Sequence, residues 1–443
     1  MVLVIIFNYL HTFIFLEMEK KKLFSIIFGI AVLGLIGSSE NVFAVSTDYL
    51  YEFGISGVND GQLGAPIQSS LNSNDDVYVI ENGNDRVSVF DSSGTFLFKF
   101  GSYGFGDGQF IDPSGIVVGL SDNVYVLDKN NRRVQIFDST GNYLNQFGSI
   151  GSLDGQFNLP QGIAVDKDGN IYVADTFNQR IQKFDSDGNH LLTFGNGLGQ
   201  QPGFFKDPST LAISDDGNIY VTDTRNHRVQ VFDSDGTFLF AFGGYGPGQD
   251  GKFTFEARGI GIDNQGNVFV GDMRAHQYQV FDLDGNFISK FGSFGSGENQ
   301  FHFPTASLGF DSMGNIFIAE SRNDRVQVFG NPVVSIMIDI KPGSDENLIN
   351  TKSKGVIPVS ILSTADFDAT TIDPSTVIFG PNGATESHGK AHIEDVNGDG
   401  LDDVVLHFKT QDSGIAKGDT ETSLTGTTFD GIAIESSDII RTK

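Results

Sequence analysis

The chain has 443 residues and no cysteine, and its 28 Lys plus Arg against 56 Asp plus Glu give a formal net charge of −28. The lack of cysteine excludes disulfide scaffolds, thiolate catalysis, iron–sulfur clusters and cysteine-ligated zinc modules. The negative charge disfavours nucleic acid as a partner, because phosphate-backbone binding needs a basic surface, and the 39% hydrophobic content excludes an acidic disordered chain.

The first 44 residues have the three parts of a secretory signal peptide. Lysines precede a fifteen-residue apolar run at 23–37, and Val42 and Ala44 put small residues at the −3 and −1 positions of a cleavage site. We expect translation to start at Met18 and the exported protein to begin at Val45, outside the cell or at the cell surface. The alternative is an uncleaved membrane anchor, although the run is shorter than the roughly 18 residues that a spanning helix needs.

Residues 45–330 contain a unit that recurs every 47 to 49 residues. Phe-Gly pairs lie at Phe53, Phe100, Phe147, Phe194, Phe242 and Phe291, and segments such as RRVQIF end at Phe90, Phe137, Phe184, Phe232, Phe281 and Phe329. Within one unit, the runs GIAV, IYVAD, RIQKF and HLLTF are separated by Asp-Gly and Gly-Asn turns, which is typical of antiparallel hairpins. Six repeats of four strands predict an all-β, six-bladed β-propeller.

The two ends of this array predict how the ring closes. The run YLYEFG at 49–54 matches the last strand of the other units, whereas the sixth unit stops at Phe329-Gly330 without a fourth strand. We therefore expect the N-terminal strand to complete the sixth blade, because this removes a free sheet edge.

The unit resembles the NHL repeat over roughly residues 48–330, in stretches such as DGQF, GIAVD and DGNIYVADT, and most weakly in the first and fifth units. Proteins with such repeats include extracellular binding propellers, an amidating lyase and the substrate-recognising part of some ubiquitin ligases. The ligases need a cysteine-ligated RING, so the resemblance implies no ubiquitin machinery here. It favours an exported binding or scaffold protein whose partner is an extracellular protein, peptide or glycan. The alternative is a secreted lyase or hydrolase of the amidating-lyase or lactonase type.

Every unit except the fifth places an acidic residue five positions before an arginine and an asparagine two before it, as in Asp175, Asn178 and Arg180. A motif present in five of six units indicates a structural brace and not one active site, since Asn favours turns and Arg pairs with carboxylates. The fifth unit has Ala275 and Gln277 in place of the asparagine and the arginine, and it adds Arg274 and His276. The departure indicates either a site or drift, and we favour drift.

The propeller histidines do not form a pattern that predicts catalysis. The resemblance to amidating lyases implies a histidine-ligated zinc near the axis, and such a site needs about three convergent ligands. The propeller carries His190, His227, His276 and His302, and we expect the equivalent His227 and His276 on loops away from the axis. We predict no catalytic residues and no cofactor-binding residues in the propeller.

The Gly-rich connectors between units carry Tyr103, Phe105, Tyr245 and Phe294. We expect these aromatic residues to share one face of the propeller. The glycines serve turn geometry, while exposed aromatic side chains are also what a peptide or glycan binding surface would use.

After Asn331-Pro332 the repeat ends, and residues 331–443 contain short runs rich in Ile, Val and Thr, such as GVIPVSIL and DVVLHF. These runs predict a β-sandwich. The segment resembles an uncharacterised module at the ends of secreted prokaryotic proteins, in the stretches IDIKPGSDENLIN, DVNGDGLDD and SDIIRT.

Residues 395–403 of this module predict a Ca²⁺ site. Side-chain oxygens stand at positions 1, 3, 5 and 9 and a backbone carbonyl at position 7, supplied by Asp395, Asn397, Asp399, Asp403 and Leu401. Position 12 is Leu406, so the loop differs from an EF-hand and is similar to the short calcium loops of dockerin-like proteins. We expect the ion to brace the loop. The alternative is a metal-free Asx-rich turn, in which the carboxylates repel one another.

Overall fold

A computed structural model describes residues 47–304, 307–330, 334–344, 346–364, 367–429 and 432–443. Regular structure in these residues is β-strand apart from four 3-10 turns, η1 (Leu120–Asp122), η2 (Thr176–Asn178), η3 (Thr224–Asn226) and η4 (Ala369–Thr371). The predicted all-β class is confirmed. The predicted signal peptide, residues 1–44, lies outside the described residues. Across the described ranges, we find no helix with the length and apolar character that crossing a membrane requires.

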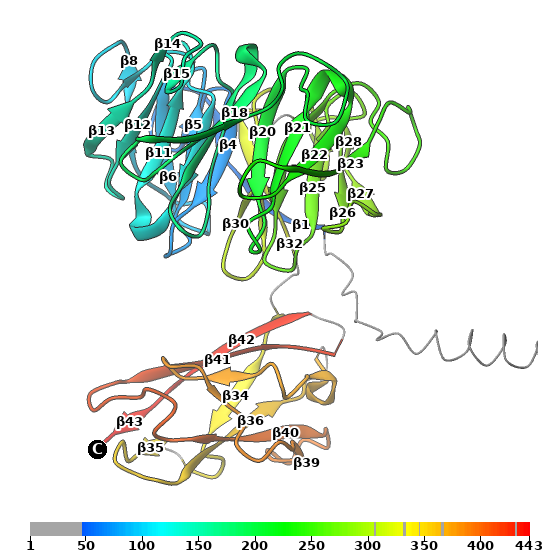
Figure 1. Cartoon of the computed structure of the whole chain (residues 1–443). Helices are drawn as coiled ribbons and strands as arrows, with labels where there is room; N and C mark the ends of the chain where they lie inside the picture. The colour runs from blue at the N-terminus through cyan, green and yellow to red at the C-terminus, as the bar shows by residue number, and fades with distance from the viewer. Residues whose placement is uncertain (1–46, 305–306, 331–333, 345, 365–366, 430–431) are drawn as a thin grey trace, which may run out of the picture. The chain divides into compact units, whose positions relative to one another are not determined.

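Residues 48–330 form six antiparallel four-stranded sheets, which we call blades 1 to 6 (Figure 1). Blade 1 contains β4 (Pro66–Leu71), β5 (Val77–Glu81), β6 (Arg86–Phe90) and β7 (Phe96–Phe100), and blade 2 contains β10 (Gly115–Val118), β11 (Val124–Asp128), β12 (Arg133–Phe137) and β13 (Tyr143–Phe147). Blade 3 contains β16 (Gly162–Val165), β17 (Ile171–Asp175), β18 (Arg180–Phe184) and β19 (His190–Phe194), and blade 4 contains β20 (Pro208–Ile213), β21 (Ile219–Asp223), β22 (Arg228–Phe232) and β23 (Phe238–Gly243). Blade 5 contains β24 (Ala257–Ile262), β25 (Val268–Asp272), β26 (Gln277–Phe281) and β27 (Phe287–Phe291).

Blade 6 contains β30 (Gly309–Phe310), β31 (Ile316–Glu320), β32 (Arg325–Gly330) and the N-terminal strand β1 (Asp48–Phe53). β1 pairs antiparallel with β32, from Asp48 opposite Gly330 to Phe53 opposite Val326. An ion pair between Glu52 and Arg325 joins the same two strands. The outermost strand of blade 6 therefore comes from the opposite end of the repeat array.

The tight turns within blades follow from Asp and Gly at fixed positions. In blade 3, one oxygen of the Asp166 carboxylate accepts hydrogen bonds from the backbone N–H groups of Asp168 (3.0 Å) and Asn170 (2.8 Å). Gly169 has a φ of 83°, which glycine adopts without steric cost. This turn reverses the chain between β16 and β17.

Successive blades are held together by apolar clusters. The last phenylalanine of each outermost strand packs its ring on a phenylalanine of the following blade. The ring centroids are 4.7 to 5.3 Å apart in the six pairs: Phe53 on Phe90, Phe100 on Phe137, Phe147 on Phe184, Phe194 on Phe232, Phe242 on Phe281 and Phe291 on Phe329. The contact from β1 to blade 1 thus has the same form as the other five. It carries the packing across the point where the two ends of the array meet.

The segments that link successive blades lie at one end of the propeller, because a four-stranded antiparallel sheet starts and finishes at the same end. We call this end the connector face, and it also holds the turns between second and third strands. Four connectors contain a short parallel pair: β2 (Ile55–Ser56) with β3 (Gln62–Leu63), β8 (Ser102–Tyr103) with β9 (Gln109–Phe110), β14 (Ser149–Ile150) with β15 (Gln156–Phe157), and β28 (Ser293–Phe294) with β29 (Gln300–Phe301). The other two have one parallel bridge each, Leu198 to Phe205 and Tyr245 to Phe253.

Residues 334–443 form two larger sheets and one short strand pair. The first sheet has the order β34 (Met337–Ile340), β36 (Val356–Leu362), β40 (Asp403–Lys409) and β39 (His392–Glu394). The second has the order β33 (Val334–Ser335), β42 (Ala433–Ile439), β41 (Glu421–Thr427), β37 (Ile378–Phe379) and β38 (Ala384–Thr385), and β35 (Leu348–Ile349) pairs with β43 (Arg441–Thr442). Side chains of both larger sheets share one buried cluster, in which the rings of Phe379 and Phe408 stack with centroids 5.0 Å apart.

Candidate functional site

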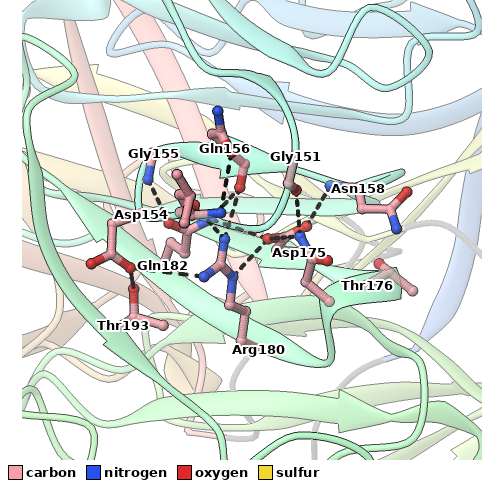
Figure 2. Close-up of polar contacts among 12 residues, drawn as sticks. Gly151, Asp154, Gly155, Gln156, Asn158, Asp175, Thr176, Arg180, Gln182 and Thr193 are labelled. Carbon is pink, nitrogen blue, oxygen red and sulfur yellow. Dashed lines mark hydrogen bonds and ion pairs between the residues drawn. The ribbon is translucent and has the colours of Figure 1, made fainter.

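The repeated acid, asparagine and arginine form a buried polar network, which Figure 2 shows for blade 3. Arg180 Nε donates to Asp175 Oδ2 over 2.8 Å, and the Asn178 and Gln182 amides donate to the same oxygen over 2.8 and 3.1 Å. Asp175 Oδ1 accepts the backbone N–H of Asn158 in the connector, over 2.7 Å. Both oxygens of this fully buried carboxylate therefore have protein donors.

The same network holds the connector on the blade. The Arg180 guanidinium donates to the carbonyl of Gln156 over 2.9 Å, and the Asn178 amide donates to the carbonyl of Gly151 over 2.8 Å. Burial raises the pKa of Asp175, and the hydrogen bonds from Asn158, Asn178 and Arg180 oppose this rise. These contacts fit the interpretation of the motif as a structural brace.

The left-handed backbone angle of this turn falls on the residue after the asparagine. Gln179 has φ 56°, and the equivalent His227 and His276 have φ 56° and 55°. Asn178 instead uses its side-chain amide to bind the connector carbonyl. The asparagine is therefore needed for its hydrogen bonds, and the positive φ is carried by its neighbour.

The connectors expose large apolar side chains at repeated positions. These side chains are between 63% and 76% exposed: Ile55, Val58, Tyr103, Phe105, Ile150, Leu153, Leu198, Tyr245 and Phe294. They follow the outermost strands along the chain, so they lie toward the rim of the connector face and not at its centre. The four aromatic residues predicted to share one face, Tyr103, Phe105, Tyr245 and Phe294, are all among them.

The connector face of blades 4 to 6 carries an additional aromatic cluster. The ring of His227 lies 5.4 Å from Tyr245 and 5.5 Å from Phe255. The Arg274 guanidinium lies 5.6 Å from the centre of the Phe255 ring and 5.9 Å from that of Phe303, distances at which cation–π attraction operates. Arg274 belongs to blade 5, the blade whose sequence departs from the repeat.

His276 extends this cluster toward blade 6. Its ring lies 4.8 Å from both Phe294 and Phe303 and 6.3 Å from His302, and its Nδ1 accepts the backbone N–H of Phe303 over 3.2 Å. Burial lowers the pKa of His276, and the nearby His302 and Arg274 lower it further. The neutral ring therefore contributes an aromatic surface near pH 7.

Two hollows lie at the ends of the innermost strands. The hollow at the connector face, about 290 Å³, is lined by Asp112, Ser114, Lys129 and Arg258 among others, and Lys129 pairs with Asp112. The opposite hollow, about 420 Å³, is lined in part by Asp122, Asp166, Lys167 and Asp215. A lyase or hydrolase of the zinc type needs three convergent ligands at this axis. Within the described part of the propeller, no three His, Asp or Glu side chains bring their ligand atoms within 4.8 Å of one another.

The predicted calcium loop is the exposed turn between β39 and β40. Asp395 Oδ1 accepts the backbone N–H of Gly398 over 2.7 Å and Oδ2 accepts that of Gly400 over 3.0 Å. Asp399 Oδ1 accepts the backbone N–H of Leu401 over 2.9 Å, and the Asn397 amide donates to Asp399 Oδ2 over 3.0 Å. The structure therefore brings Asp395, Asn397, Asp399 and Leu401 into one turn.

Asp403 lies at the base of this loop and is fully buried. Its two oxygens accept the backbone N–H groups of Ser363 over 2.8 Å and Val396 over 2.9 Å. The carboxylates of Asp395, Asp399 and Asp403 do not form a group with ligand atoms within 4.8 Å of one another. Asp395 Oδ1 also accepts the backbone N–H of Asp399 over 3.1 Å, whereas each of the other five carboxylate oxygens accepts one hydrogen bond and keeps a lone pair. The donor set therefore fits a hard cation, but its side chains must rotate to surround one.

Three histidines that no sequence pattern had marked, His388, His392 and His407, do form such a group in the same module. The only signal in the sequence is the four-residue separation of His388 and His392.

The NHL repeat matches residues 110–137, 157–184 and 205–232, which lie in blades 2, 3 and 4 and their connectors. The chain thus carries NHL repeats, and the match covers three of the six units expected. No curated protein matches the chain.

Several solved structures are similar to the propeller. The region that matches a virginiamycin B lyase from Staphylococcus aureus covers 62% of this chain and 97% of the lyase chain, with 13% identity and a TM-score of 0.45. A protein of unknown function from Bacteroides thetaiotaomicron covers 65% and 76%, with 18% identity and a TM-score of 0.49. A gluconolactonase from Xanthomonas campestris covers 65% and 97%, with 15% identity and a TM-score of 0.45. Similarity at this level carries no information on activity or substrate.

Proposed function

We propose that this protein is an exported binding protein whose propeller recognises an extracellular protein, peptide or glycan on its connector face. The observation that carries the proposal is the set of connector side chains that are apolar, large and 63–76% exposed at repeated positions. Apolar side chains exposed at the same position of successive connectors supply one face of the propeller with the groups that a partner-binding surface uses.

The centre of the binding surface in this proposal is blade 5. Its Arg274 lies between the rings of Phe255 and Phe303, and Tyr245 and Phe294 flank it on the two adjacent connectors. Tyrosine, other aromatic residues and arginine are the side chains that contribute most to binding energy in interfaces. Flat aromatic rings also stack on sugars, so a glycan fits this surface as well as a peptide does.

The brace network supports this role, because it makes the surface rigid. Connector carbonyls are fixed by buried side chains such as Arg180 and Asn178. A surface that is ordered before binding loses less conformational entropy when the partner arrives. The exposed side chains are thus presented on loops that do not need to fold on binding.

We propose a second role for residues 331–443, as a β-sandwich module that Ca²⁺ braces and that attaches or spaces the propeller at the cell envelope. The donors are Asp395, Asn397, Asp399 and Asp403, with the carbonyl of Leu401. Extracellular calcium modules bind at about 10⁻⁴–10⁻³ M, which suits an exported protein. Export itself rests on the signal peptide, and a mature N-terminus at Val45 found by sequencing the secreted protein would support it; an intact Met18 on a membrane-bound protein would instead indicate an anchor.

The binding proposal is tested by retention of the full mature chain on a glycan array and on immobilised soluble extracellular peptides and proteins. Intact envelopes are left out, because the C-terminal module alone could retain the chain on them. The double variant Tyr245→Ser/Phe294→Ser and the single variant Arg274→Ala should each weaken retention at least about tenfold, as expected for interface residues. The control is Leu97→Ser/Leu144→Ser, which removes comparably exposed side chains from the outermost strands β7 and β13, away from the connector face. Equal retention of all variants would overturn the proposal.

A further inference from the structure

Three histidines meet on one face of the first sheet of the C-terminal module. His392 is in β39, His407 is in β40, and His388 is in the segment that precedes β39. β39 and β40 are hydrogen-bonded neighbours (Figure 1), with His392 directly opposite Val405. His407 is two residues beyond Val405, so it projects from the same side of the sheet as His392.

The three imidazole rings are close together. The ring of His407 lies 4.9 Å from that of His388 and 5.4 Å from that of His392, measured between centroids. One ring nitrogen of each histidine lies within 4.8 Å of those of the other two. This face is turned away from the apolar core, because the alternate residues Val404, Leu406 and Phe408 belong to the buried cluster.

A buried carboxylate positions the segment that carries His388. The side chain of Glu386 is 4% exposed, and it accepts the backbone N–H of His388 over 2.6 Å and that of Gly389. The backbone N–H of Ser387 donates to the carbonyl of His407 over 2.8 Å. Glu386 Oε1 also lies 3.8 Å from His388 Nδ1, so a small rotation of the imidazole would form the carboxylate–histidine hydrogen bond that orients metal-binding imidazoles in many proteins.

His407 supplies a second, independent observation that points to a ligand at this place. Its Nδ1 is buried and has no hydrogen-bond partner, although buried polar atoms in folded proteins nearly always have one. A depression of about 440 Å³ opens over the three rings, lined also by Pro342, Pro358 and Glu394.

We propose that His388, His392 and His407 together bind one divalent transition-metal ion, with Zn²⁺ as the ion that fits best. Three neutral nitrogens suit zinc, copper or nickel, whereas Ca²⁺ requires oxygen donors. Zn–N bonds of 2.0–2.1 Å place the nitrogen atoms of a tetrahedral site about 3.3 Å apart. Side-chain rotations that move the ring nitrogens by about 1 Å bring the three histidines to that geometry. The depression leaves the fourth position to a water molecule or to a group of a partner.

The site is distinct from the calcium loop, although both belong to the β39–β40 hairpin. It uses nitrogen donors on the face of the sheet, while the loop offers oxygen donors at the end of the hairpin. Zinc bound here would join the segment at 388–392 to β40, a strand at the centre of its sheet.

The test is calorimetric titration of the full mature chain, purified without a histidine tag and saturated with Ca²⁺, with Zn²⁺ as the probe. We expect one zinc per chain, and we expect His388→Gln and His392→Gln to weaken binding by more than the 10–100-fold that loss of a second-shell partner causes. Glu386→Gln should weaken binding within that 10–100-fold range. Both histidines are exposed, so these variants should fold normally, which melting curves will verify.

Two control variants test whether the loss of zinc affinity is specific to the three histidines. His302→Gln removes a histidine of the propeller, and Asp399→Ala removes a donor of the calcium loop, and both should bind zinc as the unmodified chain does. Cobalt in place of zinc should give the intense visible absorption of a tetrahedral site, and this absorption should be lost in His392→Gln. Wild-type zinc affinity in both His388→Gln and His392→Gln, or a failure of the unmodified chain to bind zinc, would overturn the proposal.

Discussion

Phe53→Ala tests whether the N-terminal strand closes the ring in solution. Phe53 is 8% exposed and packs its ring on Phe90 of blade 1, with centroids 4.9 Å apart. Truncation of a buried phenylalanine costs about 3–5 kcal/mol, of which an aromatic pair contributes about 0.5–1.5 kcal/mol. The melting temperature of a domain of this order of size shifts by about 2–4 °C per kcal/mol, so the melting temperature of the propeller should fall by about 6–20 °C.

Phe194→Ala provides the matched control. Phe194 is 7% exposed and packs on Phe232 with centroids 5.1 Å apart, but its strand β19 belongs to a blade that is continuous in sequence. If β1 is held as firmly as β19, both variants should lower the transition temperature by similar amounts in scanning calorimetry. Deletion of residues 45–56 should go further and cause aggregation, because it exposes the edge of β32. The reasoning is refuted if Phe53→Ala and the deletion melt like the unmodified chain while Phe194→Ala does not.

The brace, the calcium loop and the buried tyrosines give three further predictions. Asp175→Asn should lower the free energy of unfolding, measured with denaturant, by about 3–5 kcal/mol, because it leaves the Arg180 guanidinium without its carboxylate. Asp272→Asn in blade 5, where Gln277 replaces the arginine, should lower it by only about 1–3 kcal/mol. In calorimetry of the metal-free full chain, Ca²⁺ at a hundredfold excess over Kd should stabilise the C-terminal module by about 2.7 kcal/mol, and Asp399→Ala should abolish the shift. Burial raises the pKa of Tyr78 to about 12 from 10.0. The stability that the protonated Tyr78 hydroxyl contributes is therefore complete below pH 10 and is lost as the pH rises through 12. The melting temperature should fall over that interval, and it should fall less steeply in Tyr78→Phe.

The propeller could be predicted from the sequence because each unit carries its own local signals. The alternation of IYVAD and RIQKF and the Asp-Gly turn between strands act within a few residues, so the strands found over 162–194 lie where the pattern puts them. The run YLYEFG at 49–54, which precedes the first complete unit, likewise predicts a strand, and β1 (Asp48–Phe53) begins and ends one residue earlier than that run. The backbone angle at Gln179 could not be assigned, since the turn contains both Asn and Gln and the hydrogen bonds to the connector decide between them.

The contacts that depend on tertiary structure could not be predicted from the sequence. The sequence favours drift for Arg274 in blade 5. It does not show that Arg274 meets Phe255 and Phe303, because that contact depends on how two connectors pack. His388 and His407 are separated by nineteen positions, and they meet only because β39 pairs with β40 in one register and Glu386 holds the preceding segment in place. A shift of that register by one residue would put His392 on the other side of the sheet.

Both covalent exits from the propeller lie at one end of the β1–β32 ladder, because Asp48 pairs with Gly330. If the N-terminal segment stays uncleaved as an anchor, tension between the chain before Asp48 and the chain after Gly330 peels the two strands apart from that end, one residue pair at a time. Bonds loaded in sequence resist less force than bonds loaded together in shear, so the seam that closes the ring is also where it opens under a pull. Phe53, opposite Val326 at the far end of the ladder, would be the last residue to leave.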